Sequence, residues 1–207
     1  MCQVVAQEAV SIVKSKNAAK CCMTALLFCI GSAVIVHLRF GFGVLQVLHM
    51  IVIIHLGALS GLDVCYRVLP DKILLSAFIF AIPTKAYNGF APFYKGTGPG
   101  GSYVFREMTR AIENDIACGL LGASLGFGLL YIAALIIPGS LGGGDVKMAG
   151  VIGFYLGIYY ILAALEVAFL LACAYSIPLI FLGRIKPTDS IPLGLFLSIG
   201  TVILLTL

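Results

Sequence analysis

The sequence predicts an all-α, polytopic transmembrane helix bundle of about six to seven spans, and two observations carry that prediction. Of the 207 residues, 61% are hydrophobic and only 11% are charged, whereas a soluble domain carries about 25% charged residues. The apolar residues form runs that approach the ~20 residues a helix needs to cross a bilayer. The net charge of +4 is small and scattered, so no nucleic-acid partner is expected.

The predicted spans follow one another with short polar connections. Residues 1–19 are predicted as an N-terminal cytoplasmic segment and residues 20–207 as a transmembrane domain. Residues 85–115 hold a Gly/Pro-rich piece and several basic residues, which indicates an extramembrane loop. The expected spans are 21–38, 41–61, the short run 73–83, 116–137, two within 146–183, and 191–207.

Other features of these runs receive structural interpretations. Glycines spaced by four indicate closely packed helices. The seven cysteines show no C-x-x-C spacing, so neither a disulfide framework nor a metal site is expected. His49 and His55 lie on different helix faces, which favours packing or hydrogen bonding. Glu166 interrupts an apolar run, as a functional carboxylate or as a residue near a hairpin bend. The glycine pairs are Gly122 with Gly126 and Gly153 with Gly157.

Two aspartates stand at marked turns. Asp63 ends the second span, and Asp145 follows three consecutive glycines. Either alone fits a helix cap or an interfacial carboxylate. Two predicted spans separate them, so both should emerge on one face of the membrane. Two carboxylates that converge on one water cannot both ionise, so one serves as base while the other keeps a proton. That arrangement suits hydrolysis of a peptide bond without metal or cofactor.

The distribution of basic residues favours this face being cytoplasmic, because cytoplasmic loops carry an excess of Lys and Arg. The aspartate face collects eight of them: Lys14, Lys16, Lys20, Arg67, Lys72, Lys147, Arg184 and Lys186. The opposite face has five: Arg39, Lys85, Lys95, Arg106 and Arg110.

These residues resemble the type IV prepilin peptidases, membrane aspartic proteases of the GxGD kind. The resemblance rests on Asp63-x6-Pro70-Asp71, on Gly142-x-Gly144-Asp145-x-Lys147, and on a proline-glycine-phenylalanine segment at 191–200. It implies that Asp63 and Asp145 are the catalytic pair and that Gly142 and Gly144 shape the active-site loop. Lys147 then either tunes Asp145 or snorkels at a helix end. Asp71 is expected to cap a helix first and to contact substrate second.

The resemblance also implies a reaction. A short basic leader would be removed from prepilin or pseudopilin subunits, after a glycine, at the cytoplasmic face of the inner membrane. The substrate's hydrophobic helix would sit among the spans. Longer family members carry a paired-cysteine insertion associated with N-methylation, which this sequence lacks, so a peptidase-only enzyme is expected. Because a basic face should repel a basic leader, Asp71, Asp189 or lipid headgroups are expected to assist recognition.

Two other functions remain open at this stage. A small transporter could use Asp63, Asp145 and Glu166 as ion or proton sites. It is disfavoured because the sequence shows no convincing internal repeat and both aspartates stand at span ends. A non-catalytic membrane scaffold would tolerate loss of either carboxylate.

Overall fold

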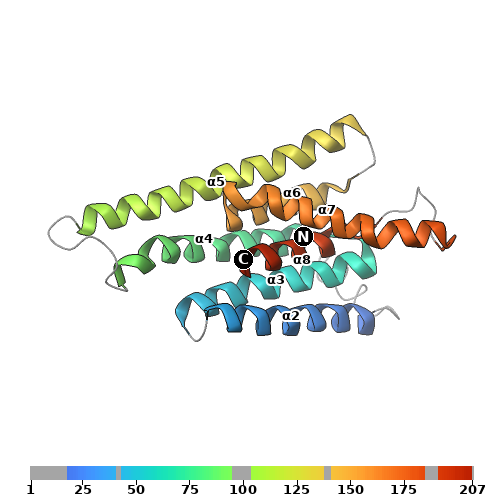
Figure 1. The fold of residues 1–207 in the computed structure, drawn as a ribbon, viewed down its shortest axis with the longest axis horizontal. Coiled ribbons are helices and arrows are strands. Elements are labelled where there is room, and N and C mark those ends of the chain that lie inside the picture. Colours follow the sequence, from blue (N-terminus) through green and yellow to red (C-terminus); the bar gives the residue numbers. More distant parts are fainter. Residues whose placement is uncertain (1–17, 41–42, 95–103, 138–140, 185–190, 207) are drawn as a thin grey trace, which may run out of the picture.

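The computed structural model describes residues 18–40, 43–94, 104–137, 141–184 and 191–206. In these ranges the chain folds into helices that lie side by side along the long axis of the molecule (Figure 1). The predicted all-α bundle is confirmed. The helices are α2 (Ala18–Phe40), α3 (Val44–Tyr66), α4 (Asp71–Tyr94), α5 (Val104–Ile136), α6 (Gly143–Leu156), α7 (Ile158–Phe181) and α8 (Leu193–Thr206).

Four of these helices are long and apolar enough to span a membrane. Their outward side chains are large and apolar, and Leu38, Ile136 and Phe181 are 80%, 72% and 87% exposed. Such a surface is stable against lipid and not against water. The protein is therefore a multi-pass membrane protein. The candidate spans are Cys21–Arg39, Val44–Tyr66, Arg110–Ile136 and Ile158–Phe181. They are fewer than the six to seven expected, because α6 and α8 are 14 residues long and α4, which is long enough, is not among the candidates.

The glycine pairs pack helices together as predicted. Gly122 of α5 lies against the backbone of Gly153 and Gly157, and Gly126 lies against the Ala149 carbonyl. A Cβ at either α5 glycine would overlap those backbone atoms. Glycine therefore permits the close α5–α6 contact that fixes the position of α6, the helix that carries Asp145.

The expectation of a loop over residues 85–115 is wrong for most of that stretch. Helix α4 continues to Tyr94 and α5 begins at Val104, while residues 95–103 lie outside the described residues. Charge suggested a loop because charged side chains seldom enter a bundle. Lys85 does enter it: its side chain is only 7% exposed and pairs with Asp115.

The bend between α6 and α7 does not lie near Glu166, as one interpretation of that residue expected. The chain breaks at Gly157, whose φ of 87° favours glycine. Glu166 is instead an exposed residue within α7. The N-terminal segment 1–19 lies outside the described residues except for its last two positions.

Candidate active site

Asp63 lies in the last turn of α3 and is only 5% exposed. Its Oδ2 accepts a hydrogen bond of 2.7 Å from the backbone N–H of Gly194, in the first turn of α8. A Cβ at Gly194 would lie 2.9 Å from that same oxygen, so glycine is required for this approach. The first N–H groups of a helix lack helical partners and favour a negative charge. The N-terminus of α8 thus provides a binding site for the Asp63 carboxylate.

A buried pair of serines joins α8 to α3 next to Asp63. The hydroxyls of Ser60 and Ser198 lie 2.7 Å apart and both side chains are fully buried. The Ser60 hydroxyl also donates to the Leu56 carbonyl, at 2.7 Å. Because Ser198 is one turn beyond Gly194, this contact holds the start of α8 against Asp63.

Asp145 lies in the first turn of α6, outside the four candidate spans. Its Oδ1 is buried and has no hydrogen-bond partner among the described residues. Burial, and after it the nearby Asp63 carboxylate, raise the pKa of Asp145 to about 6, against a hydrogen bond from the Gly142 backbone that lowers it. The two carboxyl groups are therefore close enough to interact, and Asp145 keeps its proton to a higher pH than an ordinary aspartate does.

The glycines before Asp145 differ in what they do. A Cβ at Gly144 would lie 2.7 Å from the Leu69 side chain, which belongs to the α3–α4 connection. A Cβ at Gly142 would lie 3.2 Å from Asp145 Oδ2, whereas Gly143 has open space. Gly144 therefore allows the segment after Asp63 to pack on the start of α6, and Gly142 leaves room beside the Asp145 carboxylate.

Lys147 contacts Asp71. Its Nζ donates to both carboxylate oxygens, at 2.7 and 2.8 Å. The side chains are 51% and 71% exposed, and the pair ties the start of α4 to the start of α6. Its suggested influence on Asp145 stays a prediction.

Two comparisons with known proteins find a match. Residues 50–177 match the family model of the type IV leader peptidases. The chain belongs to this family. It is 35% identical over 85 residues to the prepilin leader peptidase/N-methyltransferase of Bacillus subtilis (strain 168), a stretch that covers 41% of this chain and 34% of that relative. The match thus spans about a third of the relative's length. No solved structure matches.

In this family member, the remaining polar candidates lie elsewhere. His49 lies 2.6 Å from the Tyr155 hydroxyl through its Nδ1, and His55 Nδ1 hydrogen-bonds the Ile51 carbonyl, as their spacing favoured. Among the described residues no cluster of three or more His, Cys, Asp or Glu side chains could hold a metal ion. Asp189 lies outside the described residues.

The sequence missed two parts of the site: the Gly194 N–H that binds Asp63, and the Ser60–Ser198 contact. The segment 191–200 supplied a signal, because it placed a proline, glycine and serine at the start of the last helix. It gave no indication of which side chain this helix would meet.

Proposed function

We propose that this protein is an intramembrane aspartic endopeptidase that removes the short basic leader from prepilin or pseudopilin subunits, after a glycine. The observation that carries the proposal is the pairing of Asp63 and Asp145. They come from different helices, they influence each other electrostatically, and a glycine lies against each of them in this member of the leader peptidase family. Two adjacent carboxyls with unequal environments are the arrangement of an acid–base pair.

Their environments assign the roles. Asp63 is buried too, but it accepts the Gly194 N–H at the start of α8, which offsets that burial and favours its ionised form. Asp145 is the protonated partner, because burial and the Asp63 charge both disfavour its ionisation. Asp63 is thus the general base and Asp145 the general acid.

Hydrolysis then proceeds in two proton-transfer steps. Asp63 takes a proton from water as the water oxygen attacks the scissile carbonyl carbon, and Asp145 gives its proton to the carbonyl oxygen. The tetrahedral product is a neutral geminal diol. Asp63 next protonates the leaving nitrogen while Asp145 takes a proton back from a diol hydroxyl. The C–N bond breaks and both carboxyls return to their starting forms. No cofactor takes part.

The substrate would approach from the cytoplasmic face of the inner membrane, where we place the aspartates on the basis of the basic residues. Its leader would lie near the exposed Asp71. A shallow apolar groove of about 400 Å³, lined by Phe78, Phe127 and Val151 beside Lys147, supports an approach of the substrate's hydrophobic helix from the lipid side. We propose peptidase activity alone, without methyl transfer.

The test is cleavage of a synthetic prepilin, with a basic leader, a glycine and an apolar helix, by the full chain reconstituted in vesicles. Asp63→Asn and Asp145→Asn should each lower kcat/KM by about 10³-fold or more, because each removes one proton-transfer group. The matched control is Glu166→Gln, an exposed carboxylate on α7, which should cleave as wild type does.

Cleavage retained by either aspartate variant would contradict the proposal, as would wild type that cleaves no prepilin-like substrate. Wild type that cleaves no substrate, but that moves ions or protons across the vesicle membrane in a way that loss of Asp63, Asp145 or Glu166 abolishes, would favour the alternative of an ion- or proton-coupled transporter.

A further inference from the structure

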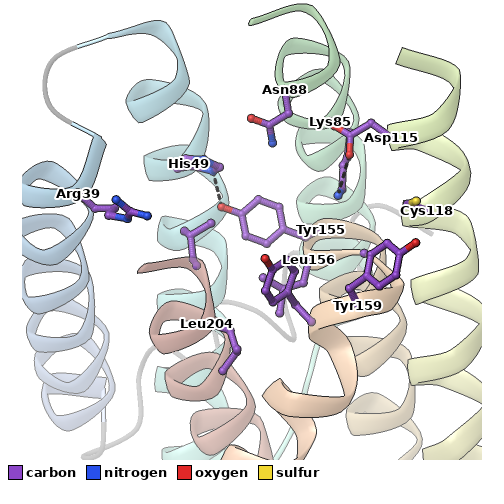
Figure 2. Close-up of a pocket in the computed structure, with 13 residues that line it drawn as sticks. Arg39, His49, Lys85, Asn88, Asp115, Cys118, Tyr155, Leu156, Tyr159 and Leu204 are labelled. Carbon is purple, nitrogen blue, oxygen red and sulfur yellow. Dashed lines mark hydrogen bonds and ion pairs between the residues drawn. The ribbon is translucent and has the colours of Figure 1, made fainter. Parts of the chain in front are cut away.

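A cavity of about 420 Å³ lies at the other end of the bundle from the aspartates, and each of the seven described helices lines it (Figure 2). His49 lines it from α3, and Asp63 lies 14 positions further along the same helix, roughly 20 Å away at 1.5 Å per residue. Lys85 of α4 and Tyr155 of α6 likewise lie near the helix ends remote from the aspartates. The cavity is therefore separate from the candidate active site.

The wall of this cavity contains a buried cation with few acceptors. Lys85 is 5% exposed, and its one ion-pair partner in the described chain, Asp115 Oδ1, lies at the long distance of 3.5 Å. An ammonium has three N–H donors, and burial makes unmet donors costly. Gly157 leaves space beside it: a Cβ there would lie 3.4 Å from Lys85 Nζ. The cavity thus presents a cation that can accept a further anionic partner.

A second cation strengthens the preference for an anion. Figure 2 shows Arg39 extending from α2 toward the cavity, and Asn88 lies above it on the same helix as Lys85. Against these two cations the lining contains one carboxylate, that of Asp115. The local charge is positive, and a planar guanidinium matches phosphate oxygens.

Part of the lining is apolar, and its position along the helices fits the level of a membrane surface. Leu156, Leu204 and Leu205 form one wall, and Tyr159 and Tyr160, 81% and 53% exposed, stand at its edge. One candidate span ends at Arg39 and another begins at Arg110. Basic residues are common at such span ends, where their charged groups reach the membrane interface. Exposed tyrosines also prefer this level.

We propose that this cavity binds the phosphate of a phospholipid headgroup from the leaflet at this end of the bundle. Lys85 donates to the phosphate oxygens, and Arg39, across the cavity beyond His49 and Tyr155, adds positive charge that attracts the headgroup. The acyl chains leave past Tyr159 and Tyr160 into the bilayer. Free phosphate shares the anionic chemistry, but the apolar wall and the exposed tyrosine edge match an amphiphile. The proposal does not depend on the peptidase activity.

The experiment titrates the delipidated full chain in detergent with phosphatidylglycerol and, separately, with inorganic phosphate, and counts bound molecules by native mass spectrometry. The site variants are Arg39→Gln and the charge-balanced double variant Lys85→Gln/Asp115→Asn. The matched control is Lys72→Gln, an exposed cation on α4. Each site variant should weaken phosphatidylglycerol binding about tenfold, while the control should bind as wild type does.

Wild type that retains no phosphatidylglycerol, or that loses as much binding through Lys72→Gln as through Arg39→Gln, would overturn the proposal. Inorganic phosphate that binds as tightly as the lipid and displaces it would overturn the lipid assignment. Because Arg39 is exposed, its variant decides the matter even if the double variant does not fold.

Discussion

The two ends of this bundle each carry a lysine–aspartate pair, and the pairs differ in burial and geometry. Lys147 and Asp71, beside the candidate active site, lie 2.7 Å apart with side chains 51% and 71% exposed. Lys85 and Asp115, at the opposite end, lie 3.5 Å apart with side chains 7% and 26% exposed. The close pair stands in solvent or headgroups, where ion pairs are weak, whereas the distant pair stands where an incomplete partner is costly.

The charged groups at the two ends of the bundle therefore have different roles. At the aspartate end Lys147 is bound to Asp71, and Asp63 accepts a hydrogen bond from a backbone N–H. In the mechanism we propose, Asp63 is the ionised and Asp145 the protonated carboxyl of the pair. At the opposite end Lys85 and Arg39 line a cavity, which we propose takes an anionic ligand.

The largest expected effect distinguishes the two lysine–aspartate pairs. Lys85→Gln should lower the free energy of unfolding by about 3 kcal/mol, because it leaves the Asp115 carboxylate poorly solvated without a cation. Lys147→Gln should lower it by less than about 1 kcal/mol, as for exposed pairs. Denaturation of both variants in the same detergent measures the contrast, and equal losses would contradict the difference in burial.

The next effect concerns the link between α8 and Asp63. Gly194→Ala places a Cβ against Asp63 Oδ2 and should lower kcat/KM by about 10²-fold, since a misplaced base loses much of its effect. Gly128→Ala serves as the control, because a Cβ there meets nothing within 4 Å. Steady-state cleavage kinetics measure both. If Gly194→Ala cleaves as well as Gly128→Ala, the backbone of α8 does not position the base.

A smaller effect follows from the pKa of Asp145, which the fold raises from 3.8 to about 6. A raised pKa means that this carboxyl favours folding below pH ~4, and that this contribution is lost as the pH rises through about 6. Asp145→Asn should therefore stabilise the protein at pH 7.5 by about 1 kcal/mol, allowing for partial solvation. Near pH 4 the variant and wild type should unfold alike. Thermal melts at both pH values test this, and a variant less stable at pH 7.5 would contradict it.

The sequence predicted the parts of this structure that depend on local pattern. Apolar runs gave the helical bundle, and two intervening helices, α4 and α5, bring the turns after α3 and before α6 to one end. The glycine pairs gave the α5–α6 contact, because small residues at that spacing act wherever two helices meet. The aspartates were found because carboxylates are rare in this chain.

Long-range contacts could not be predicted in the same way. The basic residues and the Gly/Pro-rich piece of 85–115 predicted a loop that included Lys85. The ion pair with Asp115, 30 positions away, allows Lys85 to enter the bundle instead. The contact from Gly194 to Asp63 joins residues 131 positions apart, and no local pattern encodes it. The break at Gly157 depends on a positive φ, which the surrounding apolar run concealed.

The central claim is that Asp63 and Asp145 act as one pair that shares a proton. The most direct test follows the carboxylic acid band of Asp145 by infrared difference spectroscopy against Asp145→Asn, over pH 3 to 9, in wild type and in Asp63→Asn. In wild type the band should disappear with a midpoint near pH 6. In Asp63→Asn the midpoint should fall, because the neighbouring negative charge is removed. An unchanged midpoint in Asp63→Asn would show that the two aspartates do not interact, and would contradict the account.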